Sequence, residues 1–207
     1  MRVVLLTETP PGDVFTAGTC AVAADELTAR GYEVTYRDTT KLDVSLCVGC
    51  FDCWARTPGK CRFRDDGAQV LREVVNADAV ALVGPVTFGG YAPRIKRTLD
   101  RLLPVLSPMM ARQQGEVFRR RRYRKMPSLV ALGTQAEVDG ESARVFRTIV
   151  ERNALHLHAP AFGVAVLEAT MPTTEVRLAV QAAIAAIDRT ASTPKTRPSG
   201  PQVGVRS

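Results

Sequence analysis

Five short apolar runs recur along the chain, and segments with a helical pattern separate them. Most of the runs lack polar alternation and are rich in Val, Leu and Ala, which is typical of parallel strands buried on both faces. We predict strands at 2–7, 32–37, 79–84, 128–132 and 162–167. We predict helices at about 16–30, 65–75, 93–103, 140–156 and 173–190. Strands that alternate with helices predict a doubly wound parallel α/β sheet with helices on both faces.

The first predicted helix follows a hydroxyl-rich loop, and Thr16 or Thr19 can cap it. Residues 107–126 lack a regular apolar period, so we expect an irregular basic segment there. We expect one domain over residues 1–190. The remaining residues, 191–207, are rich in Pro, Ser, Thr and Gly and predict a disordered basic tail.

The formal net charge of +7 raises the question of nucleic-acid binding. Six positive charges lie in the run 119–125, and three more lie in the tail, so the charge does not cover one face. Nucleic acid is therefore an unlikely partner. No apolar run reaches the roughly 18 residues of a membrane helix. The first run stops at Thr7 and reads as a strand instead of a signal peptide, so we expect a cytoplasmic protein.

Four of the five cysteines lie in the loop 46–66, with the spacing C-x2-C-x2-C-x7-C. Thiolates at this spacing can converge on one iron–sulfur centre, because a turning backbone brings them to the same side. The spacing alone leaves two other interpretations open: free or redox-active thiols, and zinc or disulfide chemistry. The candidate metal ligands are Cys47, Cys50, Cys53 and Cys61.

Loops that follow the strands of such a sheet are where ligands bind. The loop after the first strand combines hydroxyls and a glycine before a helix, which suits an anion. The loop 85–91 combines two aromatic residues with two glycines, which suits a planar ligand. The fingerprint G-x-G-x-x-G of dinucleotide-binding domains is absent.

The sequence resembles the flavodoxin-like family of NAD(P)H-dependent FMN reductases, and within it the iron–sulfur flavoprotein branch. Three stretches carry the resemblance: C-V-G-C-F-D-C-W, T-P-G-K-C and D-D within 47–66, G-P-V-T-F-G-G-Y at 84–91, and I-K-R-T-L-D-R-L-L-P at 95–104. The resemblance covers roughly residues 1–168. It implies a three-layer sandwich with strand order 2-1-3-4-5.

The resemblance implies FMN as cofactor, with NAD(P)H as electron donor, a small molecule or protein as acceptor, and a [4Fe-4S] cluster on the four cysteines. The cysteine loop and the segment 107–126 are long for a compact monomer, so we expect a homo-oligomer, either a dimer or a tetramer. It assigns no side chain as a catalytic acid or base. Glu8 and Asp13 are acidic where the family is expected to bind phosphate, which is unfavourable unless they point away. Two rival functions are a thiol redox sensor and a basic nucleic-acid-binding protein, both without flavin. By position, the implied flavin contacts are Thr9, Thr16, Gly18 and Thr19 after the first strand, Pro85, Val86, Thr87, Phe88, Gly89, Gly90 and Tyr91 after the third, and Gly133, Thr134 and Gln135 after the fourth.

Overall fold

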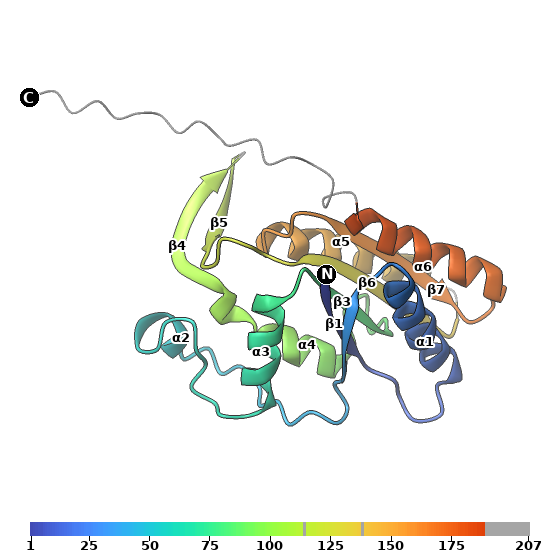
Figure 1. Cartoon of the computed structure of the whole chain (residues 1–207), viewed down its shortest axis with the longest axis horizontal. Coiled ribbons are helices and arrows are strands. Elements are labelled where there is room, and N and C mark those ends of the chain that lie inside the picture. Colours follow the sequence, from blue (N-terminus) through green and yellow to red (C-terminus); the bar gives the residue numbers. More distant parts are fainter. Residues whose placement is uncertain (114, 138, 189–207) are drawn as a thin grey trace, which may run out of the picture.

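A five-stranded parallel sheet forms the centre of the computed structural model, which describes residues 1–113, 115–137 and 139–188 (Figure 1). The strand order is β2-β1-β3-β6-β7, so the predicted flavodoxin-like topology is confirmed. The predicted disordered tail, 191–207, lies outside the described residues. The strands of the sheet are β1 (Arg2–Thr7), β2 (Glu33–Asp38), β3 (Ala79–Pro85), β6 (Ser128–Gln135) and β7 (Phe162–Glu168). The helices are α1 (Val14–Ala29), α2 (Asp52–Ala55), α3 (Asp66–Asn76), α4 (Pro93–Asp100), α5 (Gly140–His156) and α6 (Thr173–Asp188), with a 3-10 turn, η1, at Leu103–Val105.

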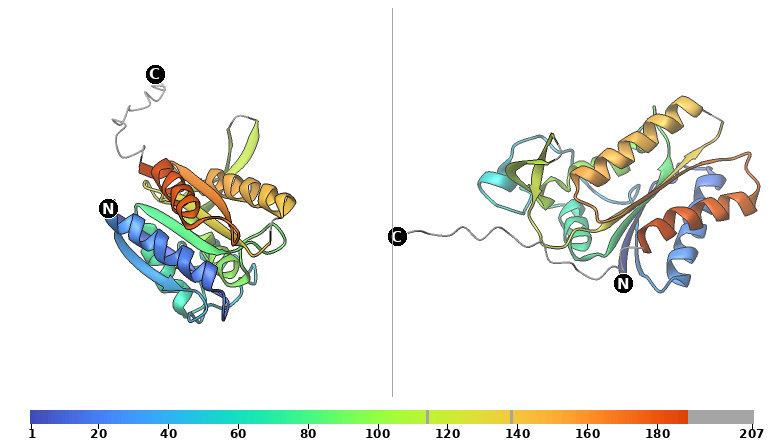
Figure 2. Two further views of the ribbon diagram at one scale, coloured as in Figure 1. Left: turned by 90° about the vertical axis from the view of Figure 1, so that its right-hand side faces the viewer. Right: turned by 90° about the horizontal axis from the view of Figure 1, so that it is seen from above.

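Helices cover both faces of the sheet (Figure 2). One core lies between the sheet and the pair α1 and α6, and the other lies between the sheet and α3, α4 and α5. The three central strands end at the same edge, because Thr7 is in register with Val83 and Gly84 with Gly133. The loops that follow β1, β3 and β6 therefore meet at this edge. In the described part of the chain, no helix combines the length and apolar character needed to span a bilayer.

Helix α1 begins earlier than predicted. Its N-cap is Asp13, whose carboxylate accepts a hydrogen bond from the Thr16 N–H at 2.8 Å. The prediction of a Thr16 or Thr19 cap is therefore wrong. Aspartate is a strong N-cap because its carboxylate accepts from a free backbone N–H of the first turn, and it stands here directly after the turn that ends at Gly12.

Residues 107–126, predicted as irregular, contain an antiparallel hairpin of β4 (Leu106–Gln113) and β5 (Glu116–Arg121). The hairpin stands out from the body of the molecule (Figure 1). Phe118 is its buried anchor, whereas Met109 and Met110 are exposed. A strand pair that is solvated on both faces lacks the apolar alternation from which strands are recognised. The arginines of β5 likewise prevented its recognition as a strand, because they interrupt any apolar alternation.

Candidate functional site

The loops after β1, β3 and β6 border one cleft at the carboxyl edge of the sheet. Its volume is about 950 Å³, and it is lined by the stretches 12–16 and 134–137 and by Pro85, Val86, Phe88, Asp139, Ser142 and Ala169. Cofactor clefts commonly have volumes of about 300–1,000 Å³. The structure thus brings together the three loops that the sequence singled out.

The loop after β3 closes in a two-residue turn. Thr87 and Gly90 exchange backbone hydrogen bonds of 3.0 and 2.8 Å, and the residues between them, Phe88 and Gly89, have φ angles of 49° and 75°. Two positive φ angles define a type I′ turn, in which a bulky side chain at the first position is strained. Phe88 is nevertheless there, and its ring is fully exposed at the rim of the cleft. A strained, exposed aromatic residue indicates a position retained for a contact.

The far end of this loop turns away from the cleft. Tyr91 is buried, its hydroxyl accepts a hydrogen bond from Asn153 Nδ2 at 3.2 Å, and its ring packs edge-on against Phe146. Burial raises the pKa of Tyr91 to about 12. A Cβ at Gly89 would lie 2.7 Å from Val145 Cγ1, so the turn rests tightly on α5. Tyr91 does not line the cleft, and its role as a flavin contact stays a prediction.

The end of β6 and the loop that follows it supply the opposite wall. Gly133 lies against Val86, where a Cβ would approach Val86 Cγ2 to 2.5 Å. The buried Thr134 hydroxyl shares a hydrogen bond of 2.6 Å with that of Thr16. Gln135 is also buried, and its Nε2 donates to the Asp139 carbonyl at 3.1 Å. Within the described residues, Gln135 Oε1 has no hydrogen-bond partner, so it can accept one from a ligand N–H.

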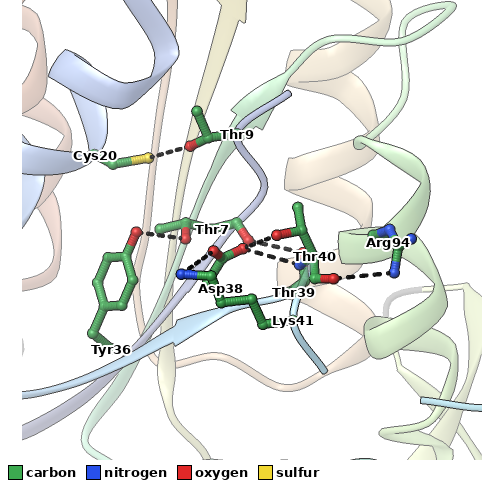
Figure 3. A network of polar contacts seen from close by, with 9 residues as sticks. All are labelled: Thr7, Thr9, Cys20, Tyr36, Asp38, Thr39, Thr40, Lys41 and Arg94. Carbon is green, nitrogen blue, oxygen red and sulfur yellow. Dashed lines mark hydrogen bonds and ion pairs between the residues drawn. The ribbon is translucent and has the colours of Figure 1, made fainter. Parts of the chain in front are cut away.

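The residues predicted in the first loop are split between the cleft and the interior. Thr16 lines the cleft, whereas the hydroxyl of Thr19 donates to the Phe15 carbonyl at 3.0 Å within α1. Gly18 lies on the exposed face of α1. Thr9 contacts the Cys20 sulfur at 3.7 Å (Figure 3). Thr9, Gly18 and Thr19 do not line the cleft as it is described, and their assignment stays a prediction.

A second group of polar contacts fixes the ends of β1 and β2 beside this loop (Figure 3). The Thr7 hydroxyl donates to Tyr36 Oη at 3.0 Å, and the Thr39 hydroxyl donates to the Thr7 carbonyl at 2.8 Å. Cys20 is buried next to the group, and burial foremost raises its pKa to about 11. The Cys20 thiol is therefore neutral near pH 7, which indicates a structural residue.

The four clustered cysteines all line one small hollow, which they share with Arg101. Burial, followed by the neighbouring thiols, raises the pKa of Cys53. The hollow measures about 20 Å³, close to the space that one water-sized particle needs. In the described part of the chain, no group of three or more His, Cys, Asp or Glu side chains is arranged to hold a metal ion. The four thiols are a donor set that suits iron.

A buried ion pair closes the base of the cysteine loop. Arg101 donates to both carboxylate oxygens of Asp65 at 2.7 and 2.9 Å and to the Ser45 carbonyl at 2.9 Å. Asp65 in turn accepts from the Ser45 N–H at 2.9 Å and caps α3 through Gly67. Residues on either side of the four cysteines are thus joined. Sequence reasoning missed Arg101, which lies 36 residues after Asp65 and has no local pattern that marks it.

The hairpin supports the other side of the loop. Trp54 Nε1 donates to the Leu106 carbonyl at 3.1 Å, and its ring stacks on Phe51. The guanidinium of Arg119, from the basic run, lies 4.0 Å from the Trp54 ring centre. Arg122 Nε donates to the Pro104 carbonyl at 2.9 Å. Arg119 and Arg122 of the basic run therefore make contacts within the protein.

Comparison with known proteins agrees with this geometry. The family described as NADPH-dependent FMN reductase matches residues 1–123. An iron–sulfur flavoprotein of Methanocaldococcus jannaschii is 28% identical over 105 residues, which are 51% of this chain and 53% of that protein. An iron–sulfur flavoprotein of Archaeoglobus fulgidus is 35% identical over 82 residues, 40% of this chain and 36% of that protein. The matches thus span about half or less of these curated relatives.

Solved structures show the same fold at low sequence identity. The NAD(P)H:quinone oxidoreductase from Methanothermobacter marburgensis superimposes with a TM-score of 0.63 and 15% identity, over 95% of this chain and 99% of that one. The apo form of an NADH:FMN oxidoreductase gives 0.60 and 14%, over 96% and 92%. At these identities the likeness concerns the fold alone.

Proposed function

Because the chain belongs to the NADPH-dependent FMN reductase family, we propose that it is an FMN-dependent oxidoreductase that takes electrons from NAD(P)H. The acceptor is a small molecule or another protein. The observation that carries the proposal is the cleft at the edge of β1, β3 and β6, with Phe88 exposed on its rim. Bound FMN would supply the hydride chemistry, and the protein would bind and orient the ring.

The described side chains divide the work of holding a flavin ring. Phe88 offers an aromatic face at the rim of the cleft. Gln135 Oε1 is positioned to accept a hydrogen bond from a ring N–H. These groups fit the planar, uncharged part of the cofactor.

Titration of the purified full chain with FMN, followed by the quenching of flavin fluorescence, tests the proposal. We expect saturable binding that Phe88→Ala weakens by about tenfold, the loss of one aromatic contact. Phe51→Ala is a matched control, because Phe51 is also exposed and also has a positive φ, of 57°, but lies in the cysteine loop. Failure of the chain to bind FMN, or equal losses in the two variants, would refute this cleft as the flavin site.

We further propose that Cys47, Cys50, Cys53 and Cys61 hold an iron–sulfur cluster, which would exchange single electrons with the acceptor or the flavin. Support comes from their shared hollow and from the named relatives. Protein purified without oxygen should contain iron and acid-labile sulfide. Cys50→Ser should lose both, whereas Cys20→Ser, outside the loop, should keep them. Equal iron content in the two variants would exclude the assignment.

We also propose that the chain forms a homo-oligomer. Apolar side chains are exposed both on the hairpin, at Met109 and Met110, and in the cysteine loop, at Leu46 and Val48. Such clusters often mark protein–protein contacts. Light scattering on the eluting protein should give a multiple of the chain mass, and Met110→Glu should reduce it. If the natural protein and Met110→Glu are both monomers, the proposal is contradicted.

A further inference from the structure

The charge of the cleft opposes the phosphate of the expected cofactor. Three acids line it, Asp13 from the start of α1 and Glu137 and Asp139 from the loop after β6. None of the described lining residues is Lys or Arg. A phosphate monoester carries a charge of about −1.5 to −2 near pH 7. Phosphate sites in proteins usually offer the opposite sign, from Arg, Lys or free backbone N–H groups.

The free N–H groups at the start of α1 are the natural place for such a phosphate, and Asp13 already occupies it. Its Oδ1 accepts from the Thr16 N–H at 2.8 Å, and its Oδ2 accepts from the Thr16 hydroxyl at 2.6 Å. The same hydroxyl is bonded to Thr134 on the far wall of the cleft. Both oxygens of the carboxylate, and the hydroxyl that would serve a phosphate, are therefore engaged.

The charged side chains beside the cleft do not offset its negative charge. The nearby Glu8 carboxylate points elsewhere, because its Oε2 accepts from the N–H groups of Arg94 and Ile95 at 2.8 and 3.0 Å. The Arg94 side chain lies toward the Thr40 carbonyl, at 3.4 Å, and does not line the cleft (Figure 3). Among the described residues, no Lys, Arg or His forms an ion pair with Asp13.

We propose that this cleft recognises the uncharged part of the flavin and gains nothing from the phosphate, and that Asp13 is the residue that sets this specificity. The proposal rests on the proposed flavin function and widens its ligand class from FMN to flavins with or without a 5′-phosphate. Riboflavin, which lacks the phosphate, should bind as well as FMN. Asp13 acts by holding a negative charge where the phosphate would lie, and the ring contacts at Phe88 and Gln135 remain available to both ligands.

The test compares the dissociation constants of riboflavin and FMN for the full chain, again by flavin fluorescence. For the natural sequence we expect the two constants to agree within about threefold. FMN should bind more tightly at high salt than at low salt, because salt screens the repulsion between Asp13 and the phosphate. Asp13→Asn keeps a good N-cap and removes the charge. It should tighten FMN by about tenfold or more and leave riboflavin unchanged, because the variant loses the repulsion that offsets the attraction of the α1 N-terminus for the phosphate.

Two further variants keep the outcome interpretable. Asp13→Ser retains a capping side chain, so it replaces the asparagine variant if that variant does not fold. Glu33→Gln removes one exposed acid at the opposite end of the sheet and should change neither constant. FMN binding tenfold or more tighter than riboflavin by the natural protein overturns the inference, as does an FMN preference that Asp13→Asn leaves unaltered. Loss of binding for both flavins refutes the proposed function itself, and the inference with it.

Discussion

Replacement of Arg101 by methionine removes the buried cation at the base of the cysteine loop while keeping an unbranched side chain of similar reach. The side chains of Arg101 and Asp65 are only 1% and 7% exposed. The change deletes two hydrogen bonds to Asp65 and one to the Ser45 carbonyl. It leaves a buried carboxylate without a countercharge, which typically costs about 3–5 kcal/mol.

The pKa of Asp65 gives an independent magnitude. Burial works to raise this pKa, but the hydrogen bond from Arg101 and those from Ser45 bring it down to about 2, against an ordinary value of 3.8. That difference corresponds to about 2 kcal/mol of stability. Asp65 keeps the N–H groups of Ser45 and Gly67 in the variant, so we expect a loss near the lower end of the range, about 3 kcal/mol.

Urea unfolding at pH 7, followed by circular dichroism, measures the loss. In thermal unfolding, the same loss of about 3 kcal/mol should lower Tm by roughly 6–12 °C in a domain of this size. The control is Lys96→Met, which breaks the solvent-exposed pair of Lys96 with Asp100 on α4 and should cost less than about 0.5 kcal/mol. The double variant Asp65→Asn with Arg101→Met should recover part of the loss, because asparagine caps α3 without a buried charge.

The pH dependence supplies a second readout. Because the folded pKa of Asp65 lies below the unfolded one, its stabilisation is present above about pH 4 and is lost as the pH falls toward about 2. The Arg101→Met variant should show a smaller loss over that window than the natural protein. If Arg101→Met lowers the free energy of unfolding no more than Lys96→Met does, and the pH dependence of stability is unchanged, the Arg101–Asp65 ion pair does not stabilise the protein as argued.

Backbone geometry predicts the effects of three further substitutions, one in the turn after β3 and two at glycines. Phe88→Asn converts the strained turn into the Asn-Gly sequence that type I′ turns prefer, so the variant should gain about 0.5–1 kcal/mol in urea unfolding while it binds FMN more weakly. A loss of stability would contradict the assigned strain. Gly163→Ala would place a Cβ 1.9 Å from the Ala183 carbonyl oxygen, so we expect a loss of more than about 3 kcal/mol or an insoluble protein. Gly140→Ala, with open space around its Cβ, should be neutral or slightly stabilising in the same unfolding assay.

The sheet could be predicted from the sequence because its central strands are continuous apolar runs. All six residues of the run 128–133 are buried, and so are all six of 79–84, which is the pattern of strands covered on both faces. The location of the cleft followed from topology, since loops at the carboxyl ends of adjacent parallel strands must meet. Phe88 was identified as a member of such a loop, but its positive φ and full exposure depend on the hydrogen bonds between Thr87 and Gly90.

The missing parts depend on distant partners. Nothing near Arg101 in the sequence distinguishes it from a surface arginine, because its partners Ser45 and Asp65 lie 56 and 36 residues earlier, at the two ends of the cysteine loop. The hairpin was missed because its strands are stabilised by each other and by Trp54, not by an apolar face of their own. The Asp13 cap of α1 was missed because it depends on the turn before Asp13, which places the Asp13 carboxylate over the Thr16 N–H.

The cysteine loop is fixed at its ends and along one side, and not at the thiols. The Arg101–Asp65 pair joins the residues that flank the loop, Asp43 and Asp66 exchange further hydrogen bonds there, and Trp54 attaches the short helix α2 to the hairpin. Between these points the chain has little regular structure, so the separations of the four sulfur atoms are free to adapt to a bound group. The ligand types could therefore be predicted from spacing, whereas their geometry is set by anchors that the spacing does not encode. The Arg101–Asp65 ion pair should accordingly control how firmly the loop is held. Loss of Arg101 should therefore reduce the iron retained by a chain in which all four cysteines are intact.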